Sequence, residues 1–177
     1  MPHAEVLLIG GRSGVGKSSV GWEVAAQLRA ADIAHALIEG DLLDAVHPTP
    51  EDDPHLARIT ERNLAAIWAN YTELGCRRLV YTNTASVLAA EERPFVRALA
   101  GPRIIRVLLT ATDATVEARL TARERGSELE QQLRRSALTA RRLADHAAPD
   151  AHRIATDGRA VRDIAAEVLT KTAWGAS

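Results

Sequence analysis

Residues 11–18 read GRSGVGKS and match the pattern G-x-x-x-x-G-K-[ST] at every fixed position. Glycines let the backbone turn so tightly that successive N–H groups point inward, where they can donate to phosphate oxygens. A helix that follows presents its positive N-terminal end to the same anion. Lys17 can then reach the β- and γ-phosphates of a nucleotide, and the Ser18 hydroxyl can ligate Mg²⁺. The pattern predicts a nucleotide site formed by Gly11, Arg12, Ser13, Gly14, Val15, Gly16, Lys17, Ser18 and Ser19.

The position of this loop in the chain supports that prediction. An ordinary glycine-rich turn with a chance Lys-Ser pair is the alternative, and such a match arises by accident in roughly one chain in a few hundred. Here the match lies directly between an apolar run, residues 6–9, and a helical pattern, residues 17–30. A phosphate loop needs that junction of strand and helix, so we favour nucleotide binding.

Two acidic residues stand two positions apart in Glu39-Gly40-Asp41, directly after a second apolar run. Alternate residues of an extended segment face the same way, so both carboxylates can look toward the phosphates. A carboxylate there can hold Mg²⁺ or accept a proton from an acceptor hydroxyl during phosphoryl transfer. A solvated turn, with Asp41 capping the next short helix, is the alternative. We predict Asp41 as a catalytic residue and Ser18, Glu39 and Asp41 as metal ligands.

Arginines gather in the region of residues 119–142. Arg119 and Arg123 are four apart, so they share one face of a helix. Guanidinium groups suit developing phosphoryl charge because they stay ionised and offer a planar fork of donors. The alternative is a solvated helix whose arginines pair with nearby glutamates, each pair contributing little. We predict that Arg119 and Arg123 are catalytic and, together with Lys17, stabilise the transferred group, and that Arg123 also binds the nucleotide.

Short apolar runs alternate with longer helical patterns along the chain. We expect strands near residues 6–9, 35–38, 78–82, 104–109 and 152–155, and helices near residues 17–30, 54–74, 87–100, 112–125, 127–147 and 159–172. Because parallel strands need crossover connections, this alternation predicts an α/β fold, a three-layer α/β/α sandwich around a five-stranded parallel sheet. Ligands of such sheets bind beyond the carboxyl ends of the strands, and each motif above follows the end of a strand.

Length and composition limit the class of protein. The 177 residues suit a single domain, and 46% hydrophobic with 25% charged residues is typical of a globular protein. A net charge of −1 gives no general attraction to nucleic acid or to an anionic membrane. Cys76 is the one cysteine, no apolar run approaches 18 residues, and the first residues lack a basic leader pattern. We expect a cytoplasmic protein, monomer or homodimer.

The phosphate loop, Glu39-Gly40-Asp41 and the arginine-rich segment together resemble the P-loop small-molecule kinases, the group that holds adenylate, shikimate, gluconate and adenylylsulfate kinases and chloramphenicol phosphotransferase. The resemblance implies strand order 2-3-1-4-5, one domain over residues 1–177, an acceptor region near residues 42–74 and a helical lid near residues 119–147. It implies that Asp41 acts as base or orients the acceptor, and that lid arginines close over ATP. It also implies that the loop with Asp157 and Gly158 passes the adenine; a cap on the last helix is the alternative for Asp157.

One departure from this resemblance concerns metal binding. The third strand is followed by Asn83, where many phosphate-loop enzymes place an aspartate that holds Mg²⁺ through water. Asn83 cannot supply that charge, which raises the importance of Ser18, Glu39 and Asp41, and it can contact the acceptor instead. The predicted acceptor contacts are Asp41, Arg58, Arg62 and Asn83. Arg12, Arg58 and Arg62 would suit a nucleoside monophosphate, whereas a sugar or antibiotic hydroxyl would use the carboxylates.

The sequence therefore predicts ATP- and Mg²⁺-dependent phosphoryl transfer to a small-molecule acceptor. A resistance-type phosphotransferase that acts on an antibiotic hydroxyl is one alternative. A non-catalytic nucleotide-binding protein or regulatory NTPase is the other, although the guanine-reading pattern N-K-x-D of small GTPases does not occur in the sequence.

Overall fold

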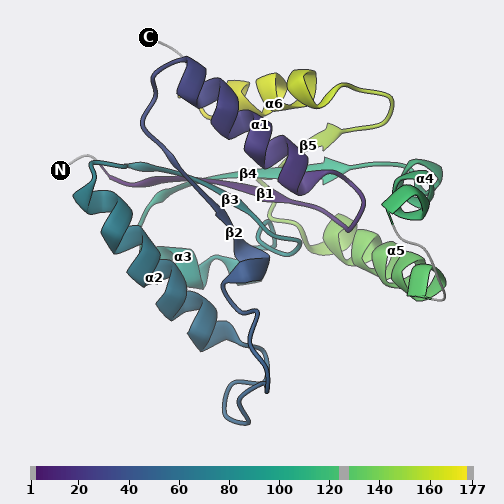
Figure 1. Ribbon diagram of the computed structural model, residues 1–177, viewed down its shortest axis with the longest axis horizontal. Coiled ribbons are helices and arrows are strands. Elements are labelled where there is room, and N and C mark those ends of the chain that lie inside the picture. The colour runs from purple at the N-terminus through teal and green to yellow at the C-terminus, as the bar shows by residue number, and fades with distance from the viewer. Residues whose placement is uncertain (1–2, 124–127, 175–177) are drawn as a thin grey trace.

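The computed structural model describes residues 3–123 and 128–174 and has a parallel sheet between two layers of helices (Figure 1). The strands are β1 (Glu5–Gly10), β2 (Ala36–Glu39), β3 (Arg78–Thr82), β4 (Arg103–Thr110) and β5 (His152–Ala155). The helices are α1 (Lys17–Ala30), α2 (Ala57–Glu73), α3 (Arg93–Ala98), α4 (Asp113–Arg123), α5 (Glu128–His146) and α6 (Val161–Thr170), with short 3₁₀ turns η1 (Gly40–Leu42) and η2 (Ala89–Glu91).

The sheet has the strand order β2-β3-β1-β4-β5, and every pair is parallel. This confirms the predicted fold class and strand order. Thr82 at the end of β3 pairs with Ile9 of β1 on one side and with Glu39 of β2 on the other. The carboxyl ends of these three strands are therefore level, and the segments that come after them emerge at one edge of the sheet.

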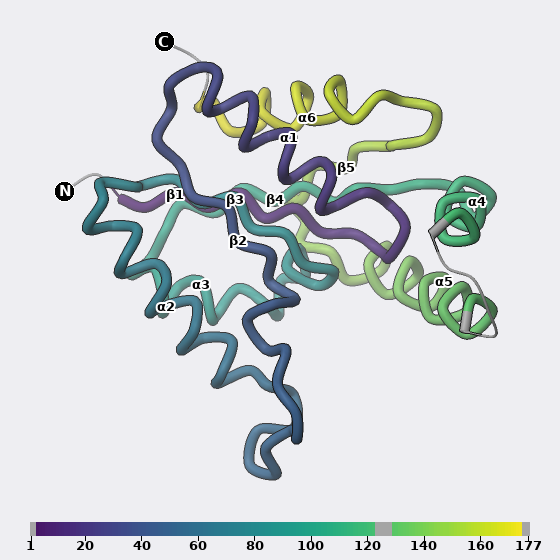
Figure 2. Tube along the Cα trace, viewed as in Figure 1, coloured from purple at the N-terminus to yellow at the C-terminus, as the bar shows by residue number. Residues whose placement is uncertain are grey.

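Alternate residues of the strands pack into two separate cores, as the period of two requires. On one face, Val6 and Leu8 pack with Leu64 and Trp68 of α2. On the other face, Leu7 and Ile9 pack with residues of α1 and α6, which contact each other. Figures 1 and 2 show α1 and α6 together on one side of the sheet and α2, α3 and α5 on the opposite side. Central strand β1 is thus buried on both faces, which explains its uninterrupted apolar run.

The sequence-based boundaries hold well, with two exceptions. The strands at residues 78–82 and 152–155 and the helix at 17–30 are confirmed without change. The helix expected at residues 87–100 was wrong in its first half, which forms η2; α3 itself is short and has Pro94 in its first turn. Proline has no N–H and is tolerated only there. The second exception is α2, which begins at Ala57 rather than at residue 54. Ser127 and Arg125 lie outside the described residues.

A buried carboxylate fixes the start of α2. Asp53 is 8% exposed, and its Oδ2 atom accepts hydrogen bonds from the backbone N–H groups of Arg58 at 3.0 Å and Ile59 at 3.1 Å. These are two of the N–H groups that a helix leaves without partners in its first turn. The neighbouring Asp52 instead forms an exposed ion pair with the Arg58 side chain.

Replacing Asp53 with Ala should therefore destabilise the fold. Loss of an acceptor for two helix N–H groups costs about 1–2 kcal/mol of the free energy of unfolding, which urea denaturation measures. Asp52→Ala is the matched control and should leave the free energy of unfolding near the wild-type value, because an exposed pair contributes little. Equal losses in the two variants would contradict this role for Asp53.

In the parts of the chain that the structure describes, no helix combines the length and the apolar composition needed to cross a membrane.

Candidate active site

The phosphate loop connects β1 to α1 at the carboxyl edge of the sheet. Gly14 and Gly16 have φ angles of 83° and 102°, in the left-handed region where a side chain would be strained. Gly16 stands immediately before α1, so the N–H groups of the loop and of the helix start lie side by side. The Lys17 Nζ atom donates to the carbonyl oxygen of Arg12 at 3.4 Å, which folds the ammonium group back over the loop. Backbone dipoles and one cation thus converge where phosphates can bind.

Hydrogen bonds with residues of α4, of α5 and of the segment before α4 hold the phosphate loop in place. The Arg12 side chain is 5% exposed and donates to the Asp113 carboxylate at 2.6 Å and to the carbonyl oxygen of Ala111 at 3.2 Å. Ser136 of α5, also buried, donates to the carbonyl oxygen of Ser13 at 3.0 Å. The Arg12 side chain is therefore engaged within the fold and not in the acceptor region, so Arg12 can serve a nucleotide only through its backbone.

Arg119 joins the phosphate loop to the segment after β5. Its guanidinium donates to the carbonyl oxygen of Val15 at 3.2 Å and, from its other arm, to the carbonyl oxygen of Thr156 at 2.9 Å. It also lies 3.0 Å from the Thr156 hydroxyl oxygen. With these bonds Arg119 is fixed beside the loop, in a position that suits nucleotide binding better than contact with a transferred group. Arg123 ends α4, and its side chain lies outside the described residues.

A cavity of about 330 Å³ lies beside Arg119. Its walls come from the phosphate loop, from α1 and from the start of α6, including Gly16, Val20, Thr156, Val161 and Ile164. Apolar side chains with a few polar groups are typical of a pocket for a flat organic ring. The cavity adjoins the phosphate loop. The base of a nucleotide would lie in such a place if the loop bound its phosphates.

Asp157 fixes the loop that approaches this cavity. Its carboxylate accepts hydrogen bonds from the backbone N–H of Thr112 at 2.9 Å and from the Thr112 hydroxyl at 2.8 Å. Hydrogen bonding to Thr115 and Thr112 lowers the pKa of Asp157 to about 2, so the carboxylate is ionised at neutral pH. The residue before α6 is Ala160, so Asp157 does not cap the last helix; it holds the loop with Gly158 against the start of α4.

The carboxylates of Glu39 and Asp41 have different partners. Glu39 ends β2 and accepts a hydrogen bond from the Trp22 indole N–H at 2.8 Å. Asp41 lies inside the turn η1 and accepts one from the Asn83 side-chain amide at 2.7 Å. The segment is not extended as far as Asp41, because the backbone turns at Gly40, so the expected alternation does not describe how the two carboxylates are placed. Asp41 does not cap that turn either, because Glu39 precedes it.

The side-chain oxygen atoms at the carboxyl edge of the sheet are suitable ligands for Mg²⁺ that is bound together with a nucleotide. Residues 3–123 and 128–174 contain no group of three or more His, Cys, Asp or Glu side chains placed to hold a metal together. Mg²⁺ prefers oxygen ligands and in nucleotide sites takes one or two from the protein, the others coming from phosphates and water. The exposed Ser18 hydroxyl and the exposed Asp41 carboxylate are ligands of that kind.

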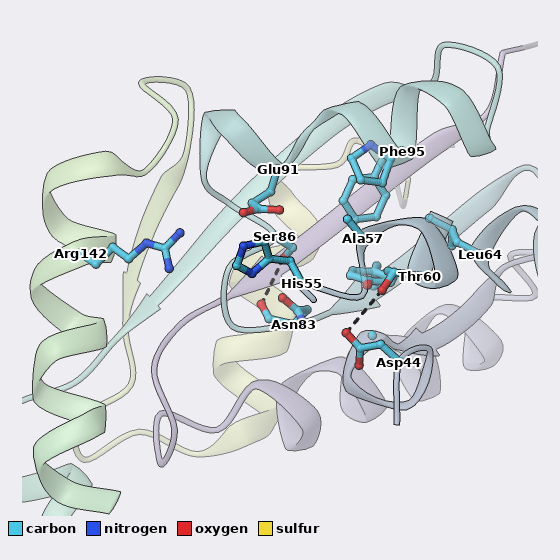
Figure 3. A pocket seen from close by; sticks show the side chains of 13 residues that line it. Asp44, His55, Ala57, Thr60, Leu64, Asn83, Ser86, Glu91, Phe95 and Arg142 are labelled. Atoms are coloured by element: carbon cyan, nitrogen blue, oxygen red, sulfur yellow. Dashed lines mark hydrogen bonds between the residues drawn. The ribbon is translucent and has the colours of Figure 1, made fainter. Parts of the chain in front are cut away.

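A second cavity, of about 570 Å³, opens beyond the ends of β2 and β3 (Figure 3). Asn83 lines it, and the Asn83 amide brings the Asp41 carboxylate to its edge. Arg58 and Arg62 do not line it; Arg58 is exposed and pairs with Asp52. The predicted acceptor contacts are thus divided, with Asn83 and Asp41 beside the cavity and the two arginines elsewhere on α2. His55, a polar candidate of the acceptor region in the sequence, also lines it, and the lining residues that sequence reasoning missed are Asp44, Thr60, Ser86, Glu91 and Arg142.

Tyr81 forms the floor of this cavity and explains the glycine at position 40. The Tyr81 side chain is 3% exposed, and its ring packs edge-on against Phe95 with centroids 4.8 Å apart. A Cβ atom at Gly40 would come within 2.2 Å of the Tyr81 hydroxyl. Burial raises the pKa of Tyr81, and the carboxylates of Asp44, Asp41 and Glu91 raise it further, so the phenol stays protonated.

No protein-family model matches the sequence, and no curated protein matches it significantly. Solved structures do match over almost the whole chain. A gluconokinase from Sinorhizobium meliloti has a TM-score of 0.62 at 20% identity, covering 98% of this chain and 94% of that one. The APS kinase of Mycobacterium tuberculosis, in complex with AMPPNP and APS, has 0.60 at 24%, covering 97% and 99%. A tunicamycin resistance protein from Deinococcus radiodurans has 0.58 at 17%, covering 96% of each.

The chain has the fold of the P-loop small-molecule kinases. In this P-loop kinase fold the order of the strands separates the two cavities. The cavity of about 570 Å³ lies at the ends of β2 and β3, whereas the smaller one lies between the phosphate loop, α4 and the start of α6. Because β1 is the central strand, the phosphate loop that comes after it stands between them.

Proposed function

We propose that this protein is a kinase that transfers the γ-phosphoryl group of ATP, with Mg²⁺, to a hydroxyl group of a small molecule. The observation that carries the proposal is the pair of cavities on either side of the phosphate loop, with the Asp41 carboxylate at the edge of the larger one. A protein that only binds nucleotide needs one cavity, whereas a transferase needs a second site for the acceptor. Structural neighbours that are kinases of gluconate and of APS support the same reading.

The groups of the site have different roles in the proposed reaction. The loop N–H groups, the start of α1 and Lys17 bind the phosphates and stabilise charge on the transferred group. Asp41 orients the acceptor hydroxyl and accepts its proton as the oxygen attacks the γ-phosphorus and ADP leaves. Asn83 holds Asp41 through the bond of 2.7 Å. The Ser18 hydroxyl and the Asp41 carboxylate would hold Mg²⁺, with Glu39 as the further predicted ligand, and the bound ion would neutralise phosphate charge.

The arginines divide into two roles under this proposal. Arg119, with its bonds to Val15 and Thr156, positions the nucleotide beside the smaller cavity. Arg123 ends the same helix and stays the predicted lid residue that contacts the phosphates.

A screen for ADP release tests the proposal directly. Wild-type protein with ATP and Mg²⁺ is mixed with nucleotides, sugars, amino alcohols and antibiotics, one at a time, beside a reaction that contains no acceptor. We expect ADP release that depends on an added compound, with a phosphorylated product of 80 Da greater mass, about the mass of the PO₃ group that kinases transfer. Slow release that is the same with and without every compound would indicate an NTPase instead.

The likeness to a tunicamycin resistance protein favours a second candidate, a phosphotransferase that inactivates an antibiotic. This candidate makes the same chemical prediction and differs in the acceptor. Expression in a sensitive host should then raise the minimal inhibitory concentration of the antibiotic that is phosphorylated, and a Lys17→Ala variant should not. A sugar as the preferred acceptor, with no protection of the host, would exclude it.

Gly40→Ala should separate acceptor chemistry from nucleotide binding. The new Cβ atom would meet the Tyr81 hydroxyl at 2.2 Å, and because the buried ring cannot yield, the turn that carries Asp41 must move. A displacement of about 1 Å costs about 10²-fold in rate. We therefore expect acceptor-dependent kcat to fall to that extent. The Kd of an ATP analogue, measured by calorimetry, should stay within about twofold, because the turn at Gly40 carries none of the phosphate-loop N–H groups. Unchanged kcat in a folded variant would contradict this geometry.

A further inference from the structure

The charges on the walls of the larger cavity are mostly negative. Asp44 and Glu91 line it, and Asp41 stands at its edge beside Asn83. All three carboxylates lie close enough to act electrostatically on the Tyr81 hydroxyl at the cavity floor. Arg142 of α5 is the arginine among the lining residues, and His55 is the other basic side chain. Figure 3 shows Asp44 and Arg142 on opposite sides of the space, with His55 and Glu91 between them.

Both carboxylates of the wall keep hydrogen-bonding capacity for a ligand. Within the described residues Asp44 has one side-chain contact, from the Thr60 hydroxyl at a long 3.4 Å, and the Glu91 carboxylate forms neither a hydrogen bond nor an ion pair. One N–H of the Asn83 side-chain amide is already donated to Asp41, and the Ser86 hydroxyl to the carbonyl oxygen of Asn83. The wall therefore offers chiefly acceptors, and a ligand that fits it must bring donors.

The Tyr81 hydroxyl offers a further group to a ligand. Tyr81 lines the cavity, its side chain is 97% buried as the complement of its 3% exposure, and no hydrogen bond joins its hydroxyl to residues 3–123 or 128–174. Its oxygen is not one of the fully buried polar atoms that lack a partner in the described residues, so it remains accessible to a ligand. A hydroxyl group of a bound molecule can exchange both donor and acceptor roles with it.

We infer that the phosphate acceptor is a compound with several hydroxyl groups and no carboxylate or phosphate group, and that Asp44 binds it by accepting hydrogen bonds from hydroxyl or ammonium groups. This inference rests on the proposed function for the identity of the cavity as the acceptor site. Placing an anion among three carboxylates is opposed by like-charge repulsion, which a single exposed arginine offsets only in part. The volume of about 570 Å³ is suited to one or two sugar-sized rings, and Leu64 and Phe95 provide an apolar wall for ring carbons.

The test compares ligands that share a carbon skeleton and differ in charge. Glucose, glucosamine and gluconate form one such set, and larger polyols, amino sugars and aldonic or phosphorylated sugars extend it. Each is titrated by calorimetry into wild-type protein that holds AMPPNP and Mg²⁺, so that binding is measured without turnover. We expect binding from uncharged or amino members and none from anionic members. A preference for amino members would identify ammonium as the group that the carboxylates bind, and a preference for uncharged ones would identify hydroxyl groups.

Variants then assign the binding to Asp44. Asp44→Asn removes the charge and keeps the shape, so the Kd of the bound compound should rise roughly tenfold or more, as for loss of a charge-assisted hydrogen bond. The matched control is Asp163→Asn, an exposed carboxylate of α6 on the opposite face of the sheet, which should change nothing. A Tm of Asp44→Asn close to that of wild type excludes a folding defect.

Two results would overturn the inference. One is binding of an anionic compound whose affinity depends on Arg142, as shown by Arg142→Gln, and does not depend on Asp44. The other is failure of every uncharged and amino compound to bind. Neither result touches the proposed function, which fails separately if a compound that binds in an Asp44-dependent manner yields no phosphorylated product with ATP.

Discussion

Replacing Asp41 with Asn should lower acceptor-dependent kcat by about 10²–10⁴-fold, the range in which a positioned base contributes. The substitution is conservative in shape. The amide oxygen of Asn can still accept the hydrogen bond of 2.7 Å from Asn83, so the side chain keeps its place while it loses its charge and its ability to take a proton. Steady-state kinetics with the acceptor found in the screen measures the effect, and calorimetry with AMPPNP shows whether the nucleotide site is intact.

The position of Asn83 gives this prediction its control. Asn83→Ala leaves the Asp41 carboxylate charged and removes the group that holds it, so we expect kcat to fall by about tenfold, as for loss of one orienting hydrogen bond. In the double variant the two losses should not add, because residues in one hydrogen-bonded pair are coupled. A kcat for Asp41→Asn near that of wild type would remove Asp41 from the role of base and leave it as a metal or acceptor ligand.

Local patterns predicted the parts of this protein that depend on local structure. The phosphate loop is a run of eight residues whose backbone angles are dictated by its own glycines, so the sequence alone reveals it. The sheet order agreed with the resemblance, and β3 was predicted to the residue because a buried parallel strand is a short apolar run between polar segments. The bounds of β5 were also predicted to the residue, although three of its four residues are exposed. The helix expected at residues 87–100 failed for an equally local reason, since proline is tolerated only in a first turn and α3 therefore begins at Arg93, just before Pro94.

The larger cavity could not be predicted in the same way, because its walls come from segments far apart in the chain. Asp44 comes after β2, Thr60 belongs to α2, Glu91 precedes α3 and Arg142 comes from α5, which reaches the site because Ala147 pairs with Leu88 after β3. No spacing in the sequence links these four. The prediction of arginines as acceptor contacts failed for a related reason. Arg12 and Arg58 were predicted to suit a nucleoside monophosphate as acceptor, yet each is paired with an aspartate, Asp113 and Asp52.

Lys17→Ala should reduce phosphoryl transfer by about 10²–10³-fold or more, as for loss of one preorganised charge on the transferred group. The chain offers an unusually clean control, because its second lysine, Lys171, lies just beyond α6. Lys171→Ala should leave kcat unchanged. The two lysines also permit a measurement of nucleotide binding that needs no acceptor. MgATP should protect Lys17 from an acylating reagent while Lys171 reacts at the same rate with and without nucleotide, as peptide mass spectrometry measures.

The protection experiment separates two ways in which the Lys17 prediction can fail. Lys17 Nζ donates to the Arg12 carbonyl oxygen at 3.4 Å, and a bound phosphate would form a charge-assisted hydrogen bond with the ammonium group. Protection together with loss of turnover in Lys17→Ala assigns both binding and charge stabilisation to this side chain. Protection without loss of turnover would confine Lys17 to binding and shift stabilisation of the transferred group to Arg123 and the loop N–H groups. Acylation of Lys17 at the same rate with and without saturating MgATP would contradict the phosphate site itself, and with it the proposed kinase reaction.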